Sequence, residues 1–261
     1  MPLTIDACAA QHQGDRKEQQ DRVAILPHPR HKGVLLAIVA DGMGGHTGGA
    51  LAAEQVVHTA RSNLEHFSPG EENPRYLLEH SMQEAHTMIK ASRFINEKDP
   101  HSTAVAMVLQ PGRATWGYCG DSRLYHFHGA RLQTRTVDHS YVEHLIASGR
   151  ITPLQALTHP NRNVLMTSLG GQDAPRFDFS ENHLPAAGDN FMLCSDGIWA
   201  YFSDDELGYL LNEHSAREAC QKIIRLARER ANGSGDNLSL AVIRLQDVAK
   251  KPASSAKHGN P

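Results

Sequence analysis

The stretch Val34-Leu35-Leu36-Ala37-Ile38-Val39-Ala40-Asp41-Gly42-Met43-Gly44-Gly45-His46 joins an apolar run to a glycine-rich turn. An unbroken apolar run of this length is typical of a strand that is buried on both faces. Asp41 then stands at the carboxyl end of that strand, and the glycines after it let the backbone turn sharply and approach a ligand. We therefore expect Asp41 to be functional and Gly42 to offer its carbonyl to a cation. Taken alone, the string is also compatible with an ordinary loop that contains an incidental aspartate.

The same pattern, an acidic residue beside Gly or Asn at the edge of an apolar strand, recurs along the chain. Each occurrence alone is typical of a turn. Together they indicate that several carboxylates converge on one site. We expect the motif around Asp121 to lie inside one strand pair. The recurrences are Gly14-Asp15-Arg16 with Asp21, Cys119-Gly120-Asp121-Ser122-Arg123, Cys194-Ser195-Asp196-Gly197 and Gly235-Asp236-Asn237.

Carboxylates gathered in one cleft repel one another unless divalent cations neutralise them. Oxygen ligands select hard ions such as Mg²⁺ or Mn²⁺, and zinc is disfavoured because no His or Cys joins the set. Two such ions about 3.5–4 Å apart can hold a bridging water and clamp the oxygens of a phosphoryl group during an in-line displacement. Such a site also needs a cation aimed at the phosphate, and Arg16 is the candidate because arginine binds phosphate through two hydrogen bonds. The residues thus predict a two-metal phosphate hydrolase.

Composition bounds the alternatives. With 261 residues and 40% hydrophobic residues, the chain can bury one sizeable core, and we expect one domain. A formal net charge of -3 provides no general basic surface for nucleic acid or an anionic membrane. The 4 cysteines are scattered without a Cys-x-x-Cys pair, which excludes a zinc ribbon and suits a reducing compartment. Since no apolar run approaches membrane-spanning length, we expect a cytoplasmic, monomeric protein without a membrane partner.

Hydrophobic periodicity predicts helices and strands in separate groups. Apolar residues at steps of three and four predict an antiparallel helical pair at 50–67 and 78–89, with Ser68-Pro69-Gly70 as the turn. A third helix is expected at 215–231, ended by Asn232-Gly233. Runs of strands with grouped helices favour a layered α+β fold, and residues 250–261 are expected to be a disordered tail. The expected strands are 33–40, 102–110, 115–127, 190–194 and 238–245.

These motifs, in this order, resemble those of the metal-dependent protein phosphatases of the type 2C (PPM) family in its bacterial single-domain form. The resemblance extends over residues 14–245, and the ordered set is far more specific than any one member. Its elements are Gly14-x-Arg16 with Asp21, Asp41-Gly42-Met43-Gly44-Gly45-His46, Ser102-Thr103-Ala104, Gly120-Asp121-Ser122-Arg123, Asp138-His139-Ser140, Ser195-Asp196-Gly197 and Gly235-Asp236-Asn237.

The resemblance implies a four-layer αββα sandwich, in which two antiparallel sheets are flanked by helices and the metals lie at one end of the sheets. It implies a catalytic domain at 1–247 with a mobile flap at about 143–171, followed by the tail at 248–261. Asp41 would bridge two Mn²⁺ or Mg²⁺ ions, and Gly42 would supply a carbonyl to one of them. Asp196 and Asp236 would complete the ligands of the other ion, while Asp121 with Asp196 would bind a third, weaker ion.

Around these ligands the resemblance implies supporting residues and two departures. Arg16 would hold the substrate phosphate, Asp21 would support metal-bound waters, and Asn237 would support its neighbouring ligand. Gln20 stands where the family often has an acidic or amide residue, so it can bind a metal-bound water without adding charge. Met43 stands where eukaryotic relatives have a histidine that acts as general acid. Met cannot donate a proton, so the candidate donors are a metal-bound water and His46. We favour the water and expect a structural or supporting role for His46.

The expected function is a protein serine/threonine phosphatase in signal transduction, which opposes a Ser/Thr kinase. A metal-bridging hydroxide would attack phosphorus directly, without a phosphoenzyme. The alternative is a catalytically weak or inactive module of the same fold that binds a phosphoprotein or a kinase. Retention of Asp41, Asp196 and Asp236 argues against that alternative, because clustered buried carboxylates are costly to keep. Titration with Mn²⁺ discriminates the two.

Overall fold

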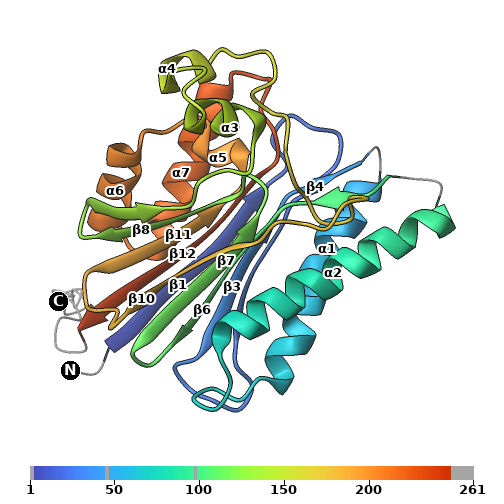
Figure 1. Ribbon diagram of the computed structural model, residues 1–261. Helices are drawn as coiled ribbons and strands as arrows, with labels where there is room; N and C mark the ends of the chain where they lie inside the picture. The colour runs from blue at the N-terminus through green and yellow to red at the C-terminus, as the bar shows by residue number, and fades with distance from the viewer. Residues whose placement is uncertain (1–2, 45–46, 97–98, 248–261) are drawn as a thin grey trace, which may run out of the picture.

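A computed structural model describes residues 3–44, 47–96 and 99–247 of the chain, and the elements of this part form two stacked sheets (Figure 1). The predicted tail and His46 lie outside these residues. Neighbouring strands are antiparallel throughout both 5-stranded sheets. The first sheet has the order β1 (Leu3–His12), β12 (Leu238–Asp247), β11 (Asp189–Cys194), β8 (Arg123–His128) and β9 (Arg131–Arg135). The second has the order β10 (Asp178–His183), β7 (Arg113–Cys119), β6 (Ala104–Gln110), β3 (Leu35–Ala40) and β2 (Arg22–Pro27).

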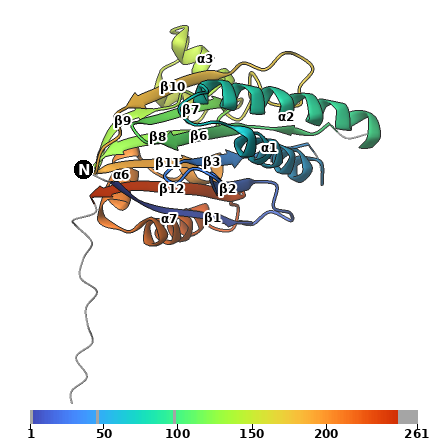
Figure 2. The same cartoon turned by 90° about the horizontal axis from the view of Figure 1, so that it is seen from below.

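Helices cover the outer face of each sheet (Figure 2). The predicted helical pair is α1 (Thr47–His66) and α2 (Pro74–Asn96), which packs on the second sheet. The first sheet is covered by α5 (Asp196–Trp199), α6 (Asp204–Glu213) and α7 (Ala216–Ala231). Two short helices, α3 (Tyr141–Ala147) and α4 (Pro153–Ala156), lie between β9 and β10, and a small ribbon pairs β4 (Gly42–Met43) with β5 (His101–Ser102). The four-layer αββα sandwich is confirmed.

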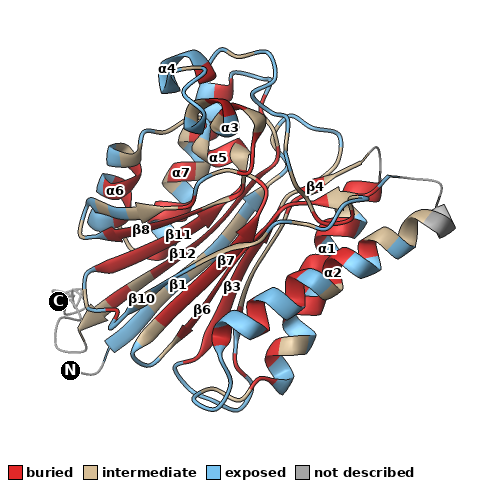
Figure 3. Cartoon of the chain, viewed as in Figure 1, coloured by how far each residue is buried: buried red, intermediate tan, exposed pale blue. Residues whose placement is uncertain are grey.

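The apolar run of β3 fills two cores at once. Successive side chains of a strand point to opposite faces, so Leu36 and Ile38 pack beneath α1 and α2 while Leu35 and Val39 pack against the other sheet. Every residue of β3 is buried, as the continuous apolar pattern predicts (Figure 3). Truncation of a fully buried side chain such as Ile38 to alanine typically costs about 2–5 kcal/mol. The strand that carries Asp41 is therefore fixed from both sides.

The last helix, α7, begins and ends where its sequence signals predict. Ser215 accepts a hydrogen bond from the Glu218 backbone, and the Glu218 carboxylate accepts one from the Ser215 backbone, which forms a capping box. Asn232 ends the helix in the left-handed conformation. This ending places the loop with Asp236 directly between α7 and β12.

One predicted strand is wrong. Residues 115–127 are not one strand, and the motif around Asp121 is not inside one strand pair. The first half belongs to β7, which pairs with β6 and β10, whereas the second half belongs to β8, which pairs with β11 and β9. Gly120 has φ 102°, a value that favours glycine, and the chain crosses from one sheet to the other at this point. Hydrophobic periodicity did not reveal the crossing because both halves are buried.

Candidate active site at one end of the sandwich

The topology brings the acidic motifs together. The strands β3, β7 and β11 end at the same end of the sandwich. At this end β2, which pairs with β3, begins, and so do β8 and β12, which pair with β11. Each acidic motif occupies one of these strand ends. The aspartates at this end are Asp21, Asp41, Asp121, Asp196 and Asp236.

Asp41 is fixed by the start of β6. Its backbone N–H donates to Thr103 Oγ1 at 3.0 Å, and its carbonyl accepts from the Thr103 N–H at 2.8 Å. The Thr103 hydroxyl also shares a 2.7 Å hydrogen bond with the hydroxyl of Ser122. Burial, and then the charges of Asp21 and the other aspartates, raise the pKa of Asp41 well above its usual range. Asp41 thus lies at the centre of the acid cluster.

Asp21 is held beside Asp196 by a hydroxyl from the other sheet. The Ser195 hydroxyl donates to Asp21 Oδ2 at 2.7 Å and accepts from the backbone N–H of Ser239 at 3.2 Å. Asp21 is only 1% exposed. Burial raises the pKa of Asp21 to about 7, opposed by the Ser195 hydrogen bond and assisted by the charge of Asp196. Ser195 therefore links β12, the end of β11 and the start of β2.

Asp196 and Asp121 form the third side of the cluster. Burial, and then the charge of Asp236, raise the pKa of Asp196 to about 6, and a hydrogen bond with the side chain of Asp41 lowers it. Oδ1 of Asp196 is buried and accepts no hydrogen bond within the described part of the chain. Burial, and then the charge of Asp196, raise the pKa of Asp121 to about 8. The negative charges of these carboxyl groups are therefore not balanced by neighbouring positive side chains among the described residues.

Arg16 reaches into this cluster from its exposed rim. Its Nη2 donates to Asp236 Oδ2 at 2.5 Å, while 61% of its side chain remains exposed. The hydrogen bond and charge of Asp236, followed by the charges of Asp196 and Asp41, raise the pKa of Arg16. The arginine expected to bind phosphate therefore lies beside the expected metal ligands.

Asn237 fastens the loop that carries Arg16. Its Nδ2 donates to the carbonyls of Gln13 at 2.7 Å and Glu18 at 3.0 Å, and its Oδ1 accepts from the Gln20 backbone N–H at 2.7 Å. Asn237 is buried, so these three bonds satisfy an amide that would otherwise be costly to bury. Asn237 thus supports the site through the Arg16 loop rather than through Asp236 alone.

Two glycines allow backbones to touch beneath the cluster. A Cβ on Gly14, which has φ 66°, would lie 1.9 Å from the carbonyl oxygen of Asp236. A Cβ on Gly197 would lie 2.0 Å from the carbonyl oxygen of Asn237. Real Cβ contacts are never so short, so both positions require glycine.

Contacts among Arg123, Asp138 and Trp199, which the sequence analysis did not predict, support Asp121. Arg123 donates to both oxygens of Asp138, at 2.8 Å and 2.7 Å, and its guanidinium lies 3.6 Å from the ring centroid of Trp199. The indole of Trp199 donates to the Asp121 carbonyl at 2.9 Å. The roles of Ser195, Thr103 and Trp199 were also not predicted, although the two hydroxyls stand within the quoted motifs.

The donor set fits hard divalent ions. Within residues 3–44, 47–96 and 99–247, no three His, Cys, Asp or Glu side chains are already arranged as a metal-binding group, and Asp236 is directed to Arg16. The buried carboxyls and the unpartnered Asp196 Oδ1 nevertheless require a positive charge, and oxygen donors favour Mg²⁺ or Mn²⁺. Gly42 lies next to Asp41 in β4, paired with Ser102.

Met43, Cys119 and Cys194, which stand in the quoted motifs, do not join the cluster. His46 lies outside the described residues, and Met43 pairs with His101 in the small ribbon. Burial raises the pKa of Cys119 to about 12 and that of Cys194 well above its usual range. Neither thiol is therefore a nucleophile at neutral pH.

Comparison with known proteins decides the family. Residues 8–238 match the family model described as protein phosphatase 2C. The chain belongs to this family. It is 32% identical over 231 residues to a putative protein phosphatase 2C-type of Streptococcus pyogenes, which covers 87% of this chain and 93% of that relative. It is 30% identical to the serine/threonine protein phosphatase PstP of Mycobacterium tuberculosis over 83% of this chain and 41% of PstP.

Solved structures of protein phosphatase 2C relatives share the fold. The serine/threonine phosphatase of S. agalactiae is similar with a TM-score of 0.84 and 25% identity, over 92% of this chain and 99% of that one. The catalytic domain of PstP, solved in complex with 2 manganese ions, is similar with a TM-score of 0.78 and 28% identity, over 94% and 100% of the two chains. This chain is accordingly a metal-dependent protein serine/threonine phosphatase by family.

Proposed function

We propose that this phosphatase hydrolyses phosphoserine and phosphothreonine in proteins at the end of the sandwich that gathers the aspartates. The observation that carries the proposal is the burial of Asp41 against Asp21, Asp121, Asp196 and Asp236, with Arg16 at the rim. Two divalent ions, Mn²⁺ or Mg²⁺, would activate a water and neutralise the phosphate when bound. No hydrophobic pocket is needed for a ligand whose reactive part is a doubly charged phosphate.

We propose that the aspartates of the cluster are shared among three metal ions as follows. Asp41 would face two ions, and the Gly42 carbonyl would face one of them. Asp196 and Asp236 would complete the other ion, and Asp121 with Asp196 would hold a third. The support for this division is the charge of Asp196, which helps to raise the pKa of Asp41, and the unpartnered Oδ1 of Asp196.

Arg16 is proposed to bind the phosphate of the substrate. Its guanidinium is exposed at the rim, so it can turn from Asp236 to a phosphate monoester and donate two parallel hydrogen bonds. Asn237 keeps its loop in place during this exchange. Asp21, held by Ser195, would orient water in the cluster, and the Gln20 side chain would assist it.

Water is proposed to displace the serine or threonine oxygen directly, without a phosphoenzyme. The buried Cys119 and Cys194 stay protonated at neutral pH, so neither competes as nucleophile. The thioether of Met43 carries no proton to give, so we assign protonation of the leaving oxygen to water. His46 keeps its proposed supporting role.

The segment 143–171 is proposed as the flap that selects substrates of the catalytic domain 1–247. It contains α4 and all but the first two residues of α3, at the same end of the molecule as the acid cluster (Figure 1). Its roots are fastened there, because the His139 N–H donates to the Gly120 carbonyl at 2.9 Å and the Met166 N–H donates to the His139 carbonyl at 2.8 Å. The part between the roots is free to differ in sequence without disturbing Asp121.

The proposed partners are phosphorylated proteins and the Ser/Thr kinase that produces them. We propose that the phosphatase acts on them as a monomer in the cytoplasm. The net charge of -3 and the acidic site favour neither nucleic acid nor an anionic membrane as a partner. Among the described residues, no helix has the length and apolarity needed to cross a bilayer.

The test is hydrolysis of a phosphothreonine peptide in Mn²⁺, with phosphate release as the readout. Asp41→Asn and Asp236→Asn should each lose at least about a hundredfold in kcat, since each removes a carboxylate proposed to hold the ions that neutralise the phosphate. Full activity in either variant would contradict the assignment. Calorimetric titration with Mn²⁺ separates the alternative, an inactive phosphoprotein-binding module, which should take up no Mn²⁺.

A further inference from the structure

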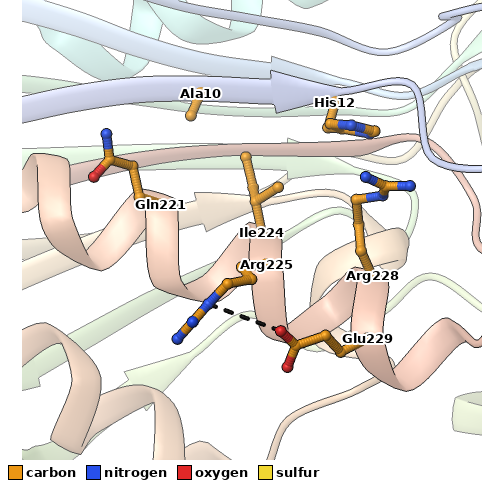
Figure 4. A pocket seen from close by; sticks show the side chains of 7 residues that line it. All are labelled: Ala10, His12, Gln221, Ile224, Arg225, Arg228 and Glu229. Carbon is orange, nitrogen blue, oxygen red and sulfur yellow. Dashed lines mark ion pairs between the residues drawn. The ribbon is translucent and has the colours of Figure 1, made fainter.

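A groove separate from the acid cluster lies between the first strand and the last helix (Figure 4). Its volume is about 610 Å³, and we call it the β1–α7 groove. Apolar side chains from both elements form its centre, and basic side chains stand around them. Its principal lining residues are Ala10 and His12 of β1 with Ile224, Arg225, Arg228 and Glu229 of α7.

Both walls of the groove lead into the proposed active site. β1 ends at His12, and the chain continues directly into the loop that carries Arg16. α7 ends at Ala231, and the chain continues into the loop that carries Asp236. The two loops are joined, because the Gly235 N–H donates to Asp15 Oδ2 at 2.8 Å. The end of the groove that holds His12 and Arg228 is therefore the end nearest Arg16.

The charges of the groove favour an acidic occupant. The side chain of Arg228 is exposed and forms no ion pair or hydrogen bond with any residue in the described part of the chain. Arg225 has one ion pair, to Glu229, at the long distance of 3.9 Å, and both side chains are mostly exposed. Figure 4 shows His12 and Arg228 facing each other across the groove. Such a local excess of positive charge is notable on a chain whose formal net charge is -3.

The backbone of β1 favours an extended occupant. β1 pairs with β12 and stands at the edge of its sheet. Every second residue of an edge strand directs its N–H and C=O away from the sheet, where an extended peptide can pair with them. Ala10 and His12 face the groove as alternate residues of β1 and would offer an apolar and a polar contact to alternate side chains of that peptide.

We propose that the β1–α7 groove binds an extended, acidic segment of the phosphoprotein substrate beside its phosphorylated residue. This inference rests on the proposed function and adds to it the class of sequence that the enzyme prefers. Arg16 comes four positions after His12 along the chain, a span of at most about 14 Å. A carboxylate about four residues from the phosphorylated one would thus face Arg228 while the phosphate contacts Arg16.

The experiment compares kcat/KM in Mn²⁺ for three substrates with wild type, Arg228→Gln and Arg228→Glu. Two are phosphothreonine peptides, identical except for glutamates or glutamines at three to five positions on either side of the phosphothreonine. The third is an aryl phosphate, which is too small to reach the groove. Wild type should prefer the acidic peptide by about three- to tenfold, as expected for a few partly exposed ion pairs. Arg228→Gln should remove this preference, Arg228→Glu should reverse it, and the aryl phosphate rate should not change.

The matched control is Arg217→Glu, which changes an exposed charge on the same helix outside the groove and should leave the preference intact. Equal rates for both peptides in wild type would overturn the inference, and so would an equal loss on all substrates in Arg228→Gln. If deletion of residues 248–261 changes the preference as much as Arg228→Gln does, that segment and not the substrate occupies the groove. If wild type hydrolyses none of the substrates, the proposed function itself fails, which is a different result.

Discussion

The guanidinium of Arg16 donates to the carboxylate of Asp236 at 2.5 Å, across 220 residues of sequence. One partner is the proposed phosphate ligand and the other is a proposed metal ligand. A cation that binds both oxygens of Asp236 must displace Arg16 from this carboxylate. The displaced Arg16 is then available to bind phosphate. The pair thus couples two binding steps that the sequence motifs suggest as independent.

Replacement of Arg16 should separate these steps. Arg16→Ala should lower kcat/KM for a phosphothreonine peptide by about a hundredfold, because a charge-assisted pair of hydrogen bonds to phosphate is lost. The same variant should bind Mn²⁺ at least as tightly as wild type, since Asp236 no longer has a competing cation. Steady-state kinetics and calorimetry measure the two effects. Arg16→Lys keeps the charge without the paired donors, and it should recover metal affinity of the wild-type strength but little activity.

Stability without metal should fall as pH rises. The pKa values of Asp196, Asp21 and Asp121 are about 6, 7 and 8 in the folded protein, above the ordinary value of 3.8. The folded state therefore holds protons that the unfolded chain releases, and this contribution is fully present below about pH 4 and is lost as pH rises through the folded pKa values. In chelator, the melting temperature of wild type should decline from pH 5.5 to 8.5.

The Asp121→Asn variant provides the control for that decline. It removes the carboxyl with the pKa of about 8, so its melting temperature should fall less than that of wild type over the same range. Mn²⁺ should raise the melting temperature of wild type more at pH 8.5 than at pH 5.5, because metal ligands must be deprotonated. Parallel pH curves for the two proteins in chelator would contradict the raised pKa of Asp121.

Removal of the Ser195 hydroxyl should weaken metal binding without unfolding the protein. Ser195→Ala leaves Asp21 without its 2.7 Å donor and the Ser239 N–H without its acceptor. The expected cost is about 1–3 kcal/mol of unfolding free energy, together with about a tenfold loss in Mn²⁺ affinity, since groups that orient ligands typically contribute this much. Denaturant unfolding and calorimetry measure both. Ser180→Ala, on the exposed side of β10, should change neither quantity.

The sequence allowed the layers of the fold and the acid cluster to be predicted because both depend on local patterns. β3 is apolar throughout, so its burial between α1 and the other sheet follows from the residues themselves. Asp41, Asp196 and Asp236 stand next to such strands, so their position at strand ends follows as well. The strands that were missed, β1, β2, β9 and β10, are the edge strands of the two sheets, and none of them is a continuous buried run.

Contacts between distant segments could not be predicted from local patterns. Nothing in the sequence around Ser195 shows that its hydroxyl meets Asp21, because the two are 174 residues apart. Likewise, the crossing at Gly120 depends on which strands pair with β7 and β8, which is a property of the whole fold. The preference of Gly197 for glycine is visible only when Asn237 packs against it.

The contact between Gly197 and Asn237 leads to a final prediction. In Gly197→Ala the new Cβ would lie 2.0 Å from the carbonyl oxygen of Asn237, so the start of α5 and the loop after Asp236 must move apart. We expect a loss of about 1–3 kcal/mol in unfolding free energy, as for other overpacked sites, and a loss of activity beyond what that instability explains, because Asp196 and Asp236 shift relative to each other. Gly171→Ala is the matched control, since its nearest neighbour would lie at an ordinary 3.6 Å. Urea unfolding and phosphopeptide hydrolysis at 25 °C, where both variants are folded, measure the two effects. A Gly197→Ala protein as stable and active as Gly171→Ala would show that the two backbones can separate without disturbing the acid cluster.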